Sequence, residues 1–444
     1  MVATWPRVYG KITLAPRWFE AYAGSTMHRL TSLGVGLVLA ATLLLMIGCR
    51  DGGESGGMTP QPTGRIGATA TLQSGVQPPP RPADFAGYPD AIAAYLTEAG
   101  DAALGPPCPA ELLAAWVMAE PDVPLTPEER CITGNTDADA DEEVVALFTA
   151  DLEDGFGLLS NVVVFDKTEE GYEAVYQSWW ASDRIADLVP HAIVAAEDVT
   201  GDGTGNLVYT STLCGAHTCT LRVHVLADGA FTGYMQLTPE ESISMETADV
   251  LLEDRDGDGV QEIVLHGGTI SSVGAGVQRT RTEVYAWNGE LYELAETIFD
   301  ASGLLYFAIR DADLHFDEGN YGDAADAYRT ALADDSLVES GFQENERPEL
   351  SAYAVYRFAL SQLAGGGSSA EPIAALEQSL GEYAGTVNVG LGEVFAATYA
   401  NAGGLHGACL AVRDHITANL DSFQAVWEYG YANPTFDAEN VCPF

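Results

Sequence analysis

Apolar and polar positions alternate with a period near two between about residues 130 and 300, and with a period near 3.6 on both sides of that region. The shorter period is typical of half-buried strands and the longer one of amphipathic helices. The sequence therefore predicts one domain over residues 85–300, a helical lead-in followed by strands, and a helical domain over residues 301–444. The lead-in pattern is carried by Ile92, Tyr95, Leu96, Leu112, Leu113, Trp116 and Val117.

The strand region repeats one plan three times: a strand, an acidic loop, a second strand and a closing hairpin. The acidic loops begin at Asn135, Asp198 and Asp254, in steps of 63 and 56 residues. This spacing suits one four-stranded unit per repeat. The clearest hairpin, residues 285–292, contains Asn288-Gly289, a pair that favours a two-residue type I′ turn.

The third loop, residues 254–262, has carboxylates at positions 1, 3 and 5 and glycine at position 6. Such carboxylates can converge on one cation, position 7 can offer a backbone carbonyl, and the glycine permits a sharp turn. Oxygen ligands in this arrangement are those that calcium prefers. An EF-hand would place Glu at position 12 and then a helix, whereas this chain has Leu265 within an apolar, β-branched run, which predicts a strand.

The candidate ligands occupy positions 1, 3, 5, 7 and 9 of each loop. They are Asp254, Asp256, Asp258, Val260 and Glu262 in the third loop, Asp198, Thr200, Asp202, Thr204 and Asn206 in the second, and Asn135, Asp137, Asp139, Asp141 and Glu143 in the first. The second loop has the fewest carboxylates, and the first has Ala140 in place of glycine. We expect calcium affinity to fall in the order third, first, second. The alternative is that all three are solvated Asp-Gly turns.

These loops resemble the cation loops of FG-GAP/VCBS-type β-repeats, in which the loop joins two strands of a blade. The resemblance implies calcium as a cofactor and blade-like antiparallel sheets. Three blades do not readily close a ring, because propellers usually have about four to eight. We therefore expect a multidomain α+β protein with a partial propeller, or alternatively a β-sandwich, followed by an α-helical-repeat domain.

One helix of the last domain resembles the second helix of a tetratricopeptide repeat, in which small and aromatic residues interlock. The helix before it departs from that pattern at Asp311. Residues 354–363 with 373–380, and 395–402 with 405–412, predict two further helix pairs. The resemblance implies a docking module, and a helical domain without a groove is the alternative. The matching residues are Tyr321, Ala324, Tyr328, Ala331 and Leu332.

Residues 33–47 form an uncharged apolar run that ends at Gly48-Cys49. The run has the length of a signal-peptide core and is short for a membrane span. It resembles the lipobox of bacterial lipoproteins, which implies a signal segment over residues 1–49, with Met27 as an alternative start, and lipidation of Cys49. An uncleaved membrane anchor is the alternative. Residues 50–84, rich in Gly, Ser, Thr and Pro, predict a disordered tether.

The six remaining cysteines are an even number, which favours disulfides in an exported protein. Sequence alone leaves their connectivity open. Cys214 and Cys219, together with His217 and His224, form an alternative and weaker pattern for zinc. Nearest-neighbour pairing predicts Cys108 with Cys131, Cys214 with Cys219, and Cys409 with Cys442.

The formal net charge is −46, from 19 basic and 65 acidic residues. Because phosphate recognition needs basic patches, this charge argues against nucleic-acid binding. The histidines show no ligand spacing typical of zinc hydrolases. The sequence predicts a non-enzymatic, extracytoplasmic lipoprotein of the bacterial envelope, anchored in the membrane by lipid, with a calcium-stabilised β module and a helical module that docks a protein or glycan. An envelope hydrolase and a structural spacer are the alternatives.

Overall fold

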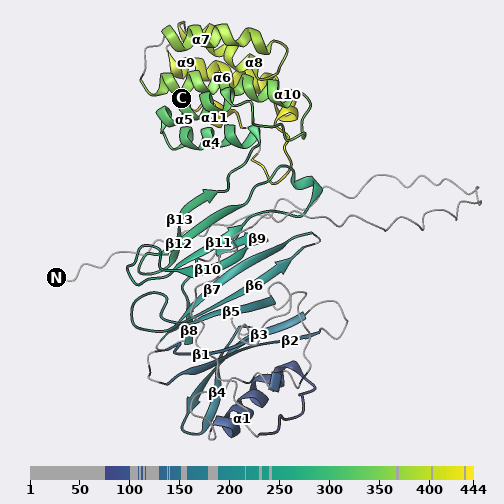
Figure 1. The fold of residues 1–444 in the computed structure, drawn as a ribbon, viewed down its shortest axis with the longest axis vertical. Helices are drawn as coiled ribbons and strands as arrows, with labels where there is room; N and C mark the ends of the chain where they lie inside the picture. Colours follow the sequence, from purple (N-terminus) through teal and green to yellow (C-terminus); the bar gives the residue numbers. More distant parts are fainter. Residues whose placement is uncertain are drawn as a thin grey trace, which may run out of the picture. The chain divides into compact units, whose positions relative to one another are not determined.

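A computed structural model describes most of the chain from Val76 onward (Figure 1). The described residues are 76–100, 109, 112–113, 116, 130–137, 139, 141–151, 158–178, 189–215, 217–229, 233–239, 243–366, 370–401, 404–434 and 437–444. They form a mixed α+β structure, as the sequence predicts. The expected signal segment, Cys49 and Cys108 lie outside these residues. Within the described part, no helix combines the length and apolar character needed to cross a bilayer.

The described strands form three antiparallel sheets whose first four strands follow chain order. Sheet A contains β1 (Cys131–Gly134), β2 (Glu143–Asp151), β3 (Leu158–Thr168) and β4 (Gly171–Gln177). Sheet B contains β5 (Val189–Glu197), β6 (Asn206–Cys214), β7 (Cys219–Gly229) and β8 (Gly233–Gln236), and β9 (Ile243–Glu246) also pairs with β7. Sheet C contains β10 (Asp249–Glu253), β11 (Glu262–Gly267), β12 (Arg281–Trp287) and β13 (Tyr292–Phe299).

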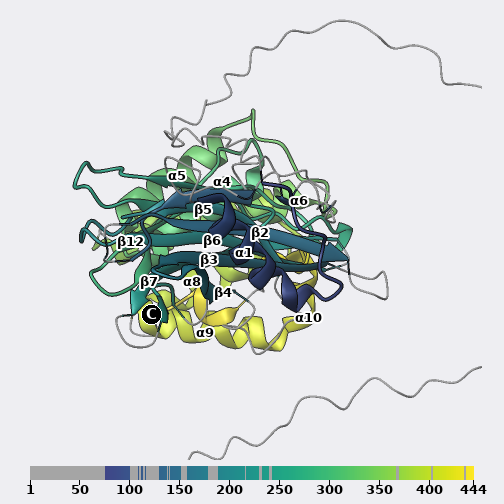
Figure 2. The same cartoon turned by 90° about the horizontal axis from the view of Figure 1, so that it is seen from below.

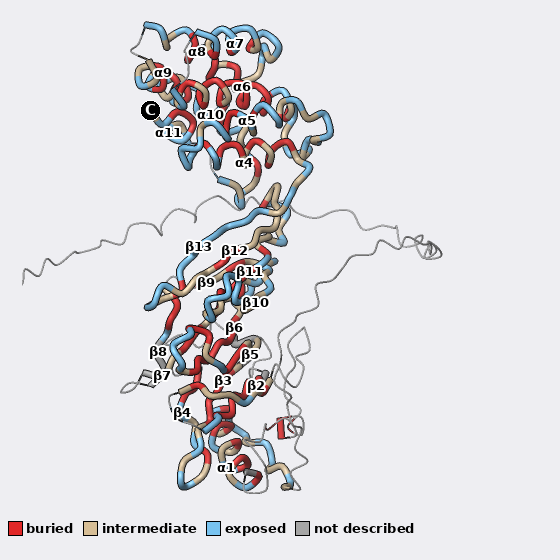
Figure 3. The backbone as a smooth tube through the Cα atoms, turned by 60° about the vertical axis from the view of Figure 1, so that its left-hand side comes forward, coloured by how far each residue is buried: buried red, intermediate tan, exposed pale blue. Residues whose placement is uncertain are grey.

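The sheets pack face to face through successive apolar clusters. One face of sheet A, including Phe148 and Phe165, packs against α1 (Tyr88–Gly100), which follows the short helix η1 (Phe85–Gly87). Figure 2 shows α1 lying across these strands. The other face of sheet A packs against sheet B, and the far face of sheet B packs against sheet C. Consequently β2, β3 and β6 are largely buried, whereas β13 is mostly exposed (Figure 3).

The helical region packs around one continuous apolar cluster. Its main helices are α4 (Leu305–Asp317), α5 (Tyr321–Ala333), α6 (Glu346–Ala364), α7 (Ala370–Leu380), α8 (Val389–Tyr399) and α9 (Leu405–Ala418), followed by α10 (Leu420–Val426) and α11 (Ala438–Val441). The short helix η3 (Gly381–Tyr383) follows α7. The predicted helix pairs are present, although α6 begins at Glu346 rather than near Ala354.

A buried arginine connects the helices to the end of the chain. The Arg357 side chain is 1% exposed and its Nε lies 3.2 Å from an Asp313 carboxylate oxygen. Its Nη1 donates to the carbonyl oxygens of Asn440 and Val441, each at 3.1 Å. The disulfide between Cys409 and Cys442 holds the same segment. A charge and a covalent bond therefore both fix the last helix against the domain.

The loop between β11 and β12, which contains η2 (Val273–Ala275), contacts the segment after α10 mainly through backbone atoms. The amide of Val277 donates to the Tyr429 carbonyl at 3.1 Å, and the amide of Tyr431 donates to the Gly274 carbonyl at 3.1 Å. A Cβ at Gly276 would lie 1.6 Å from the Tyr429 oxygen, so only glycine fits there. Sheet C therefore meets the helical region at a close-packed junction.

Two expectations from the sequence are wrong in detail. The hairpin of β12 and β13 is closed by a four-residue loop, because Trp287 pairs with Tyr292 and only Gly289 of the Asn288-Gly289 pair has positive φ. The Asn288 side chain instead accepts from the amides of the two last loop residues. The expected tether also ends before residue 84, since the Pro79 carbonyl accepts a hydrogen bond from Trp116 Nε1 at 2.9 Å.

Candidate cation-binding loops

The three acidic loops occupy the same place in their sheets. Each joins the first and second strands and contains eight residues, 135–142, 198–205 and 254–261. The side chain at position 9 of each loop starts the second strand and accepts a hydrogen bond from the backbone amide at position 2. These bonds join Glu143 to Thr136 at 2.5 Å, Asn206 to Val199 at 3.0 Å, and Glu262 to Arg255 at 2.8 Å. One geometry is thus built three times.

Backbone amides also orient the carboxylates at position 1. Asp254 accepts from Gly257 at 2.7 Å and from Gly259 at 3.2 Å. Asp198 accepts from the corresponding glycines of the second loop at 2.7 and 2.8 Å. All four glycines have φ between 71° and 93°, a left-handed region that other residues rarely adopt. In the first loop, Asn135 instead donates to the Asp139 carbonyl oxygen at 2.7 Å.

Positions 5 and 7 form further turns of the same kind in all three loops. The position-7 amide donates to the position-5 carboxylate, and the donors are Asp141 at 2.8 Å, Thr204 at 2.7 Å and Val260 at 2.8 Å. The acceptors are Asp139, Asp202 and Asp258. Thr200 at position 3 of the second loop lies 3.5 Å from Asp198 and 3.4 Å from Asn206. The described residues of the three loops therefore share the turn at positions 5 and 7, whereas position 1 of the first loop departs from the other two.

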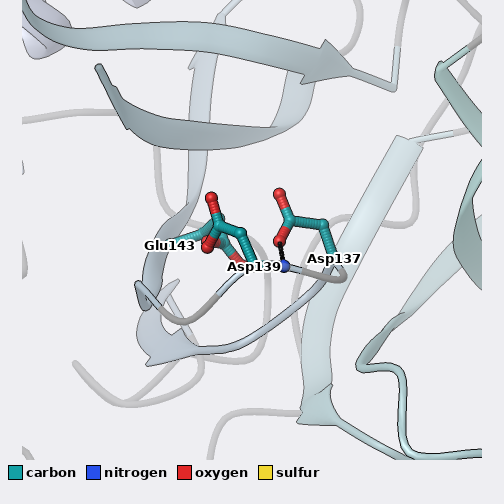
Figure 4. A group of neighbouring side chains, drawn as sticks. All are labelled: Asp137, Asp139 and Glu143. Carbon is teal, nitrogen blue, oxygen red and sulfur yellow. Dashed lines mark hydrogen bonds between the residues drawn. The ribbon is translucent and has the colours of Figure 1, made fainter. Parts of the chain in front are cut away.

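Among the described residues, carboxylates gather closely enough to share a cation in two of the loops. Asp254, Asp256 and Asp258 form one group, and all three are exposed. Asp137, Asp139 and Glu143 form the other, with their nearest oxygens within 4.8 Å of one another (Figure 4). The donors are all oxygen atoms, which fits a hard cation such as calcium. The second loop, with its two Asp residues, forms no such group in the described part of the chain.

Stacking of the sheets explains why the two groups differ in burial. The position-9 residue shares a strand face with residues that pack against the next sheet, as Glu143 does with Val145 and Leu147. Glu143 is 0% exposed and Asn206 is 1% exposed, whereas Glu262, in the last of the three sheets, is 9% exposed. The first loop is therefore partly enclosed, while the third lies at the surface.

Burial has a marked effect on the Glu143 carboxyl. Burial raises its pKa to about 7, and the nearby carboxylates of Asp137 and Asp166 act in the same direction, against the hydrogen bonds from Thr136. Its Oε2 accepts the two Thr136 bonds, but its Oε1 is buried without a hydrogen-bond partner. The Oδ1 atom of Asp166, on β3, is also buried and unpartnered. Asp166 was not predicted, because it lies outside the loop pattern.

The loops of neighbouring sheets contact one another. A Cβ at Gly205 would lie 1.7 Å from the Asn135 carbonyl oxygen, so the first and second loops meet through backbone. The Tyr292 hydroxyl lies 3.0 Å from the Val199 carbonyl oxygen and 3.1 Å from that of Gln261, which links the second and third loops. A cavity of about 360 Å³ separates parts of the first two loops and is lined by Asn135, Asp137, Asp139, Glu142, Glu197 and Asp198, among others.

The cysteine and histidine cluster does not provide zinc ligands in this structure. Cys214 and Cys219 form a disulfide that closes the hairpin of β6 and β7, so neither offers a thiolate. His224 Nε2 lies 2.7 Å from Ser211 Oγ, and the imidazole stacks on the Tyr209 ring. Cys131 is also disulfide-bonded, and its predicted partner Cys108 lies outside the described residues.

Comparison of the chain with protein-family models, with curated proteins and with solved structures finds no match in any of the three.

Proposed function

We propose that this chain is a non-enzymatic lipoprotein of the bacterial cell envelope, in which calcium stabilises a stack of blade-like sheets and a tetratricopeptide-like helical module docks a protein or glycan. The supporting observation is the threefold recurrence of one loop geometry at the contacts between sheets. Unrelated Asp-Gly turns would not be expected to share the same length, the same position-9 hydrogen bond and the same place in the sheet. Calcium in these loops would neutralise carboxylates that otherwise repel one another.

Thermal unfolding of the full-length chain in detergent tests calcium binding. Calcium that binds only the folded chain stabilises it, by about 2.7 kcal/mol per site at a concentration 100-fold above Kd. We expect a higher melting temperature in about 5 mM calcium than in chelator, and a smaller rise with magnesium, which demands stricter octahedral geometry. Identical transitions in calcium and in chelator would refute the proposal.

Variants assign the response to particular loops. Replacing Asp256 and Asp258 by Ala removes two of the three carboxylates grouped in the third loop. This change should reduce the calcium response more than Asp202→Ala, since the second loop has fewer charged ligands. Equal effects of the two changes would indicate that the response arises elsewhere.

The lipid anchor rests on the apolar run that ends at Gly48-Cys49. Mass spectrometry of membrane-extracted protein should find acyl chains on Cys49 as the mature N-terminus. The Cys49→Ser chain should remain uncleaved or leave the membrane fraction. Mature protein that retains an unmodified Met1 would contradict this part of the proposal.

The docking role is supported by the helix pairs, in which Ala324, Tyr328 and Ala331 of α5 are buried at the spacing expected for interlocking helices. Affinity capture from envelope extracts, performed with and without calcium, tests it. If the intact helical module docks a partner, the same bound species should be recovered with and without calcium, provided that the β module remains folded. Recovery of no species above the level of an unrelated lipoprotein would favour a structural spacer.

A further inference from the structure

Building on the proposed calcium loops, we infer that Asp166 of β3 completes the first site and that this site binds its cation more tightly than the third. Asp166 belongs to no acidic loop. Register brings it to the site: Val144 on β2 pairs with Phe165 on β3, so the next residues outward, Glu143 and Asp166, face each other across the two strands. Residues opposite one another in an antiparallel pair point to the same side of the sheet.

Each of these two carboxylates has one buried oxygen atom without a hydrogen-bond partner. Glu143 Oε1 and Asp166 Oδ1 are two of only four buried side-chain nitrogen or oxygen atoms without a hydrogen-bond partner among the described residues. An ionised carboxylate only accepts hydrogen bonds, so each oxygen requires a donor or a cation. Burying a charged group without such a partner is costly. The charges that act on both side chains are those of other carboxylates, including Asp137 in each case, so they repel these carboxylates rather than neutralise them.

A hydrated cation supplies both missing partners. Asp137, Asp139 and Glu143 lie close enough together to coordinate one ion directly. Asp166 does not belong to that closely spaced group, so the geometry assigns it to a hydrogen bond from a cation-bound water. Calcium sites commonly include such waters, and a carboxylate that accepts from a ligand water strengthens binding in the same way as other outer partners of metal ligands.

The other two repeats lack this carboxylate. Asn206 in the second repeat pairs with Ala227, and the register of β11 with β12 places Ala286 opposite Glu262 in the third. The third loop also contains Arg255 at position 2, where the first has the neutral Thr136. Together with the exposure of its three Asp residues, this makes the third loop less negative and more solvated than the first. The inferred affinity order is therefore first, then third, the reverse of the order expected from the loop sequences alone.

Hydrogen exchange detected by mass spectrometry tests the inference on the full-length chain, because it follows each loop separately during a calcium titration. Protection of residues 135–143 should appear at lower calcium than protection of residues 254–262. The Asp166→Asn change should raise the calcium midpoint of the first segment by about tenfold, because the asparagine oxygen still accepts from the water but no longer carries the charge that makes this hydrogen bond strong. The midpoint of the third segment should not change.

Two further variants complete the test. Glu169→Gln removes an exposed carboxylate from the hairpin of β3 and β4 and should shift neither midpoint, which controls for net charge. Ala286→Asp introduces the missing carboxylate into the third repeat and should lower the midpoint of that segment several-fold, a gain that misfolding cannot imitate. Unchanged midpoints in both Asp166→Asn and Ala286→Asp, or earlier protection of the third loop, would overturn the inference while leaving calcium binding intact. No calcium-dependent protection in either segment would refute the proposed function as well.

Discussion

The buried charge of Arg357 offers a sharp test of what holds the helical region together. Arg357→Met removes the guanidinium but keeps a long apolar side chain against Phe316, whose ring centroid lies 3.8 Å from the guanidinium carbon. The partner Asp313 has a side chain that is only 3% exposed. Its carboxylate would then depend on Arg310 at 2.8 Å and on the hydroxyls of Tyr328 and Tyr353.

Removing one member of a buried ion pair typically costs about 3–5 kcal/mol, because the other charge stays buried. The remaining partners of Asp313 place the expected loss near the lower limit, about 3 kcal/mol. The Arg357→Met change also leaves two carbonyl oxygens of the C-terminal segment without the donor that they share, so that segment should loosen first. Arg329→Met is the matched control, since Arg329 and its partner Asp326 are 64% and 68% exposed. Such a surface pair contributes only about 0–1 kcal/mol.

Urea unfolding at neutral pH, followed by far-ultraviolet circular dichroism, reports mainly on α4 to α9. Arg357→Met should lower the free energy of unfolding well beyond the control. Adding Asp313→Asn to Arg357→Met should recover part of the loss, because the buried carboxylate is then gone and Arg310, whose side chain is 30% exposed, can be solvated by water. Equal stability of Arg357→Met and Arg329→Met, or a further loss in the double variant, would refute the assignment of Arg357 and Asp313 as an energetically coupled pair.

Three further outcomes are expected. Burial, with help from Arg222, lowers the pKa of His224 to about 4, so the unfolded chain binds more protons than the folded chain between that pH and about 6.5. In urea titrations, the stabilisation of the wild type relative to His224→Gln should be complete above this window and should decrease as the pH falls through it, by at most about 3 kcal/mol. Gly205→Ala should lower the free energy of unfolding by about 1–3 kcal/mol and weaken the calcium-dependent protection of the first loop, because its Cβ would meet the Asn135 carbonyl oxygen. Gly303→Ala is the control and should change neither quantity appreciably, because Gly303 faces open space. Replacing both Cys409 and Cys442 by Ser should lower the free energy of unfolding by about 3–4 kcal/mol, and replacing both Cys214 and Cys219 by about 2 kcal/mol, because the first bridge spans 33 residues and the second 5. Equal losses in urea titrations without reductant would contradict this explanation by loop-closure entropy.

The acidic loops could be predicted because their information is local. Alternating carboxylates, glycines and the residue at position 9 all lie within nine positions, and the hydrogen bonds that shape each loop join residues of that same stretch. The helix pairs were predictable for the same reason, since Tyr321 and Tyr328 of α5 repeat at helical spacing. Local patterns thus identified most of the elements and the candidate ligands.

Asp166 illustrates why the remainder was missed. It lies 23 residues after Glu143 in the chain and reaches the site only through the register of β2 with β3. A signal was nevertheless present, because alignment of the three repeats on their hairpins places Asp166 where the others have alanine. No comparable signal exists for Arg357 and Asp313, since two charged residues on different helices give no indication that packing will bury both.

The contacts between loops also determine which sequence changes this architecture can accept. The second loop lies between its neighbours, with Gly205 against the Asn135 backbone and Gly201 against Val260 and Gly259. The glycines of the second loop therefore maintain the distance between neighbouring sheets, whereas its candidate ligands act only on the cation site of that loop. Such a loop can lose a charge and keep these contacts, whereas the insertion or deletion of a residue would disturb the packing of two sheets. The second loop, with only two carboxylates but both glycines of the turn, can therefore act as a spacer between the other two loops whether or not it binds a cation.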